Sequence, residues 1–167
     1  MKDELARGLM TTDMASDATV SKSSLSISWP HIVLSVIGIA LSCYSVFVHA
    51  QIKRGDETGC GVSDTITCDK VLSSPYSEFL SIPLGAWGIV FFVVVILTAI
   101  STKSSTATSR QNAAWRLAIT AAGFLTSIAL TYISVVKIGA VCPVCMATHT
   151  ATLLLFLVSS YSYPKTR

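Results

Sequence analysis

Four of the five cysteines in this sequence form two groups whose spacing suits thiol chemistry. Cys142 and Cys145 stand in a C-x-x-C motif, whereas Cys60 and Cys68 are separated by seven residues in a polar segment. A disulfide between Cys142 and Cys145 would close a very small ring, so it would constrain the unfolded chain little and add little stability. The C-x-x-C motif is therefore interpreted as a redox pair whose disulfide forms and breaks during exchange.

The sequence around the C-x-x-C motif predicts that it stands at the start of a helix. Pro143 suits the first helical position, because its missing N–H and fixed φ cost nothing there. Cys142 then lies near the N-cap and Cys145 one turn inside, with both thiols on the same side. The partial positive charge of the helix N-terminus favours a thiolate, particularly at Cys142.

The elements that position these cysteines are predicted to be membrane helices. The chain has 167 residues, of which 51% are hydrophobic and 13% charged. The charge-free intervals are long enough to cross about 30 Å of hydrocarbon as helices, and too long and unbroken for the strands of a barrel. The fold class is therefore an all-α integral membrane protein with a four-helix bundle. The four predicted spans are His31–Gln51, Ile82–Ile100, Trp115–Val136 and Cys142–Tyr161.

The distribution of basic residues predicts the orientation of this bundle. Eight Lys and Arg residues flank the side that holds both termini and the 101–114 connector, and four flank the other side. By the positive-inside rule, both termini are expected in the cytosol. All four paired cysteines then lie on the opposite, oxidising face, where disulfides persist.

Three regions are distinguished along the chain. Residues 1–28 lack apolar periodicity and are predicted to be a disordered cytosolic tail, residues 29–163 the membrane domain, and residues 164–167 a short cytosolic tail. The 52–81 loop between the first two helices is long enough to suggest a function of its own. The bilayer is an expected partner, and no nucleic-acid partner is predicted.

Two other roles for the cysteines, packing and metal binding, compete with redox exchange. Cys43 lies within the first helix and is expected to be a small buried apolar residue. A zinc site of four cysteines is disfavoured, since the spacing in the loop is wide and oxidising conditions favour disulfides; no metal site is predicted. A non-enzymatic membrane scaffold with two structural disulfides is the alternative from a different functional class.

The topology suggests where electrons would travel. A pair in the loop can reach the thiols of a soluble protein and pass electrons inward to the helix pair by thiol exchange. Cys145, a turn deeper than Cys142, would face a pocket among the helices that could hold a quinone.

The sequence resembles the vitamin K epoxide reductase family, including its bacterial homologues that drive disulfide formation. The segments that carry the resemblance are 41–50 (LSCYSVFVHA), 60–88 (CGVSDTITCDKVLSSPYSEFLSIPLGAWG) and 139–149 (GAVCPVCMATH). The resemblance implies a four-helix bundle around a quinone, with Cys60 and Cys68 as the loop pair and Cys142 and Cys145 as the active pair. It also implies that Cys145 is the thiol that reacts with the quinone.

Three further residues are assigned to the quinone pocket or the loop on this resemblance. Ser74 matches a Ser or Thr that helps to position the loop. His149 stands where animal members have a Tyr, and Trp87 lies in a segment, SIPLGAWG, of bacterial type.

The expected function is a membrane thiol–disulfide oxidoreductase that takes electrons from a thioredoxin-like partner and reduces ubiquinone, menaquinone or vitamin K. Reduction of vitamin K epoxide or quinone to the hydroquinone for its own sake is the alternative within this class. A bacterial inner membrane is favoured over the endoplasmic reticulum.

Overall fold

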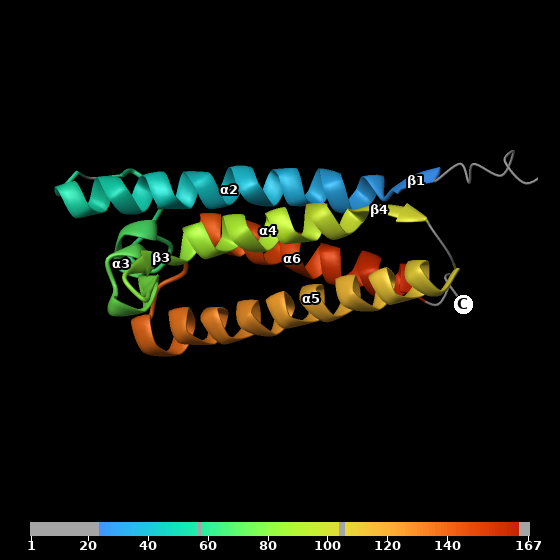
Figure 1. Cartoon of the computed structure of the whole chain (residues 1–167). Coiled ribbons are helices and arrows are strands. Elements are labelled where there is room, and N and C mark those ends of the chain that lie inside the picture. Colours follow the sequence, from blue (N-terminus) through green and yellow to red (C-terminus); the bar gives the residue numbers. More distant parts are fainter. Residues whose placement is uncertain (1–23, 57, 104–105, 164–167) are drawn as a thin grey trace, which may run out of the picture.

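A computed structural model of the chain describes residues 24–56, 58–103 and 106–163. Most of the predicted cytosolic tail of residues 1–28, and all of the tail of residues 164–167, lie outside the described residues. Four long helices run side by side (Figure 1). They are α2 (Trp29–Arg54), α4 (Leu84–Ala99), α5 (Thr106–Tyr132) and α6 (Pro143–Ser162). A π-helical segment, η2 (Ile133–Ile138), continues α5.

Three of these helical stretches are long and apolar enough to cross a membrane: Trp29–Arg54, Arg110–Ile138 and Pro143–Ser162. Helix α4 is apolar throughout but has only 16 residues, which gives a length of about 24 Å. The predicted span Ile82–Ile100 was longer than this helix. The difference arises because Ile82 and Pro83 before α4, and Ile100 after it, adopt extended conformations. The chain is a multi-pass, mainly helical membrane protein.

Small residues allow the helices to approach closely. A Cβ atom on Gly85 of α4 would lie 3.0 Å from the Ser42 carbonyl oxygen and 2.9 Å from Val46 of α2. A Cβ atom on Gly38 would lie 2.3 Å from the buried ring of Phe92. Since lipid supplies no hydrophobic drive between helices, such close packing is what holds them together. An apolar core of Phe92, Val95, Ala151 and Leu155 lies between α2, α4 and α6.

A cap formed by residues 55–83, of which Glu57 is not described, covers one end of the bundle (Figure 1). It contains α3 (Cys68–Leu72), the 3-10 turn η1 (Pro75–Ser77) and a hairpin of β2 (Glu78–Phe79) and β3 (Ile82–Pro83). Leu80 and Ser81 form the hairpin turn with positive φ. Leu72 of the cap is buried in one apolar cluster with Val48 of α2, so the cap and the bundle share part of their core.

At the other end of the bundle, β1 (Ser24–Ile27) pairs antiparallel with β4 (Ile100–Lys103). The sequence suggested tail and connector at these positions, because neither segment shows strand periodicity. The structure shows that the residues leaving α4 and entering α2 pair with each other through their backbones.

Candidate functional site

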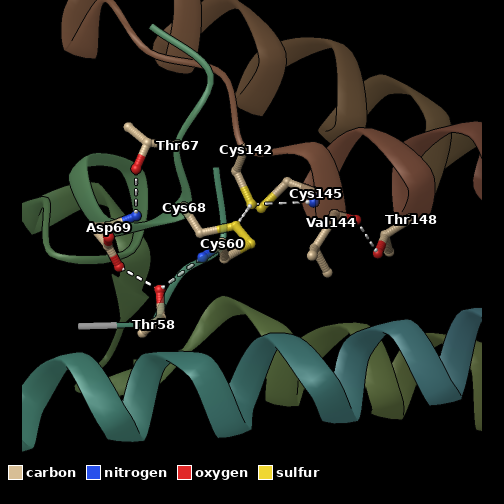
Figure 2. Close-up of a disulfide and its surroundings, with 9 residues drawn as sticks. All are labelled: Thr58, Cys60, Thr67, Cys68, Asp69, Cys142, Val144, Cys145 and Thr148. Carbon is tan, nitrogen blue, oxygen red and sulfur yellow. Dashed lines mark hydrogen bonds between the residues drawn. A yellow bond between two sulfur atoms is a disulfide. The ribbon is translucent and has the colours of Figure 1, made fainter. Parts of the chain in front are cut away.

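Cys60 and Cys68 are joined by a disulfide within the cap, with Cα atoms 5.4 Å apart. The Cys68 N–H donates to the Cys60 carbonyl over 2.7 Å, and the Thr67 hydroxyl caps α3 by accepting from the Asp69 N–H. Thr58 donates to the Asp69 carboxylate over 2.5 Å and accepts from the Cys60 N–H (Figure 2). Cys68 is fully buried and Cys60 is partly exposed. Within the disulfide, Cys60 is therefore the cysteine nearer the protein surface, and Cys68 the one in the interior.

Cys142 is the N-cap of α6, as the sequence predicted, and Pro143 occupies the first turn. Its sulfur accepts from the Cys145 N–H over 3.3 Å. Both Cys142 and Cys145 are free cysteines; Cys142 is buried and Cys145 partly buried. The motif thus presents two thiols on one side of the first turn of the helix.

A short backbone contact between the cap and the start of α6 brings the two pairs together. The Thr67 N–H donates to the Val141 carbonyl over 3.1 Å, and the Val141 N–H donates to the Thr65 carbonyl over 2.7 Å. Each of these hydrogen-bonded stretches ends one residue before a cysteine, Cys68 in the cap and Cys142 at the helix. The Sγ atoms of these two cysteines lie 3.4 Å apart.

The three sulfurs at this junction, those of Cys68, Cys142 and Cys145, lie next to one another, and Cys68 is bonded to Cys60 (Figure 2). A separation of 3.4 Å is close to the distance at which a thiolate attacks a disulfide. Because Cys142 and Cys68 are fully buried, water is excluded from the point of exchange.

The environment of Cys142 favours its thiolate form. The pKa of the Cys142 thiol is lowered from 9.0 to about 7. A hydrogen bond from the Cys145 side chain is the largest cause, and backbone N–H groups of Cys145 and Val144 add to it, while burial opposes them. A substantial fraction of Cys142 is therefore nucleophilic at neutral pH.

A cavity of about 450 Å³ lies on the inner side of Cys145. Side chains from α2, α4, α5, α6 and the cap line it, and they are mainly apolar, with Phe91 and Phe92 among them. Its size and lining suit an aromatic ligand with few polar groups. Ser74, Trp87 and His149, the three residues assigned by resemblance, all line this cavity together with Cys145.

The side chains of Ser74 and Trp87 both donate hydrogen bonds to backbone carbonyls of the cap. The Ser74 hydroxyl donates to the Val71 carbonyl over 2.7 Å. The Trp87 indole N–H donates to the Phe79 carbonyl over 3.3 Å, and its ring packs edge-on against that of Phe79 with centroids 6.0 Å apart. The contacts of Trp87 therefore join α4 to the cap, whereas the bond of Ser74 lies within the cap.

His149 lies one turn beyond Cys145 and makes its hydrogen bond to another helix. Its Nδ1 lies 2.9 Å from the hydroxyl of Thr131 on α5. Thr131 in turn donates to the Ser127 carbonyl over 2.8 Å.

An ionic contact that the sequence analysis missed fixes the cap to the end of α2. His49 Nδ1 donates to the Leu72 carbonyl over 3.0 Å, and Nε2 lies 3.0 Å from a Glu78 carboxylate oxygen that also contacts Lys53. The hydrogen bond from Lys53, and then that from His49, lower the pKa of Glu78 below its ordinary value. The signal available in the sequence was that His49 and Lys53 stand four apart on one helix, and so share a face.

The prediction that Cys43 is buried was wrong. Helix α2 turns Ser42 and Ser45 toward the interior and leaves Cys43 exposed on the outer surface of the bundle. Cys43 therefore takes no part in the cysteine cluster.

A known protein family matches most of the chain. The sequence profile of the vitamin K epoxide reductase family matches residues 29–160, which include the cap and all four long helices except the last two residues of α6. No individually curated protein matches the chain. Members of this family are oxidoreductases, and the buried cysteine cluster is consistent with redox activity in a membrane. The chain belongs to the vitamin K epoxide reductase family.

Proposed function

We propose that the protein is a membrane thiol–quinone oxidoreductase that supports disulfide formation on the non-cytoplasmic face. Electrons pass from a thioredoxin-like partner to Cys60 and Cys68, then to Cys142 and Cys145, and finally to a quinone. The observation that carries this proposal is the 3.4 Å separation of the Cys68 and Cys142 sulfurs. A free thiol so close to a disulfide favours thiol–disulfide exchange over the alternative, a scaffold with two structural disulfides.

The exchange between the pairs proceeds through one mixed disulfide. After a partner dithiol has reduced the loop pair, the Cys68 thiolate attacks Cys142 in the Cys142–Cys145 disulfide and releases the Cys145 thiolate. The Cys60 thiolate then attacks Cys68 and releases Cys142. The loop pair is now oxidised and the C-x-x-C pair reduced, which are the states that the structure holds.

The final step returns the C-x-x-C pair to its disulfide. Two electrons leave the two sulfurs and enter the quinone, which takes up two protons and becomes a hydroquinone. The cavity beside Cys145 supplies the place for the quinone. The chain's own contributions are the reacting sulfurs and an apolar lining that excludes water.

The orientation in the membrane is part of the proposal. Helix α4 would cross together with the other three, so that both termini are cytosolic and the cap faces the periplasm of a bacterial cell. The excess of Lys and Arg on the terminal side supports this orientation.

The test is quinone reduction by the purified protein, with a thioredoxin-like dithiol as electron donor. The wild-type protein should reduce a soluble naphthoquinone, whereas the Cys145→Ser variant should not. Cys43→Ser, which alters an exposed cysteine outside the cluster, is the matched control and should keep the wild-type rate. Quinone reduction at the normal rate without Cys145 would contradict the proposal. Assaying the epoxide in parallel distinguishes the alternative, reduction of vitamin K epoxide.

A further inference from the structure

The hydrogen bonds around His149 indicate which of its ring nitrogens carries a proton. We assign the single hydrogen of the Thr131 hydroxyl to its bond with the Ser127 carbonyl, 2.8 Å away, in which the hydroxyl is the donor. With that assignment the hydroxyl oxygen accepts from His149, so Nδ1 carries the hydrogen at 2.9 Å. In the neutral ring, Nε2 is then a bare acceptor.

Nε2 is also unpaired, since it makes no hydrogen bond within the part of the chain that the structure describes. The His149 side chain lines the cavity beside Cys145. Cys145 and His149 stand four apart on α6, so they lie on the same face of the helix. An unpartnered proton acceptor thus shares the cavity with the thiol that is proposed to reduce the quinone.

The cavity offers few other groups that exchange protons. Among the described residues that line it, the titratable side chains are Tyr76 from the cap and Cys145 and His149 from α6; those from α2, α4 and α5 do not titrate. Of these three types, imidazole is the one suited to taking up and releasing a proton near neutral pH.

We propose that His149 transfers the proton of the Cys145 thiol to the quinone, and that Thr131 is the positioning residue that keeps Nε2 free to do so. The inference rests on the proposed quinone reduction. His149 Nε2 accepts the Cys145 proton as the sulfur electrons leave, and the imidazolium then donates that proton to an oxygen of the reduced quinone. Cys142 reacts as the thiolate that the exchange with Cys60 and Cys68 releases, and solvent supplies the second proton of the hydroquinone. Two electrons and two protons reach the quinone, and a disulfide remains.

The test compares variants of the purified, pre-reduced protein mixed rapidly with a soluble naphthoquinone over a range of pH. His149→Gln keeps a polar group of similar reach but transfers no proton, so quinone reduction should slow by about 10²-fold or more and lose its pH dependence near neutrality. Thr131→Val removes the acceptor for Nδ1–H without changing the side-chain volume. It should slow the reaction about five- to tenfold and move the midpoint of the pH–rate profile.

Two further variants separate a proton-transfer role from a structural one. Thr131→Ser retains the hydroxyl and should restore the wild-type profile. Thr150→Val loses a similar hydroxyl bond, to the Met146 carbonyl, at an exposed position away from the cavity, and should not alter the profile. Disulfide exchange between the protein and its dithiol donor, measured without quinone, should be unchanged in all of them.

A His149→Gln protein with the wild-type rate and pH profile would overturn the inference. If that variant does not fold, the Thr131→Val protein is the decisive one. The inference would be overturned if its rate and pH profile of quinone reduction equalled those of Thr150→Val. Failure of the proposed function itself looks different, because a Cys145→Ser protein would then still reduce quinone.

Discussion

The sulfur atom of Cys142 lies 3.4 Å from that of Cys68, which is already joined to Cys60 in a disulfide. These two cysteines are 74 residues apart in the sequence, and both are fully buried. The hydrogen bonds of Val141 with Thr65 and Thr67 set the chain segments side by side just before the cysteines. Backbone hydrogen bonds therefore hold the two cysteine pairs in contact.

Removing the Cys145 side chain should make Cys142 a weaker acid. The Cys145 thiol is the largest cause of the lowered pKa of Cys142, which is about 7. In Cys145→Ala the pKa should rise toward 9.0, so the thiolate fraction at neutral pH should fall. The ultraviolet absorbance of the thiolate, titrated in a Cys43→Ala background with Cys142→Ser as the blank, measures this. An unchanged midpoint would contradict the assigned cause.

The Glu78 contact should hold the cap against the bundle in a pH-dependent way. A carboxyl group whose pKa is lowered stabilises the fold above its ordinary pKa of 4.5, and this contribution is lost as pH falls through the lowered value. Glu78→Gln should therefore raise amide hydrogen exchange in α3 and η1 at neutral pH, and wild-type protein should approach this state only in acid. Asp64→Asn, a change of the same kind at an exposed cap residue, is the control. Equal exchange in the two variants would show that Glu78 does not hold the cap.

Gly85 should not tolerate a larger residue. A Cβ atom there would meet the Ser42 carbonyl oxygen and the Val46 N–H, which are backbone atoms of α2 and cannot move aside alone. Gly85→Ala should destabilise the protein by about 1–3 kcal/mol, the usual cost of overpacking. Thermal unfolding in detergent measures the loss, and Ala147→Ser, at an exposed position of α6, is the control. A thermal midpoint equal to that of the control would mean that the two helices can separate freely.

The sequence predicted those parts of the site that depend on neighbouring residues. Pro143 and the C-x-x-C spacing indicated a helix that begins at the motif, and charge-free intervals indicated the long helices. The sequence did not predict contacts that need the tertiary fold. Glu78 meets His49 only because the cap folds back over α2, and Cys43 faces outward because of the rotation of α2 in the bundle. The contact of His149 with Thr131 likewise depends on how α5 and α6 are rotated against each other.

The central claim is that electrons cross from the loop pair to the helix pair through a bond between Cys68 and Cys142. The most direct measurement is peptide mapping of the non-reduced Cys60→Ser/Cys145→Ser protein by mass spectrometry, after mild oxidation. Without Cys60 and Cys145 nothing in the cluster can resolve the mixed disulfide, so a Cys68–Cys142 bond should accumulate in nearly all molecules. The control is Cys68→Ser/Cys145→Ser, which should form far less of the alternative Cys60–Cys142 bond. If Cys68 and Cys142 stay unlinked in the first protein, or the two proteins cross-link equally, the relay through this contact is contradicted.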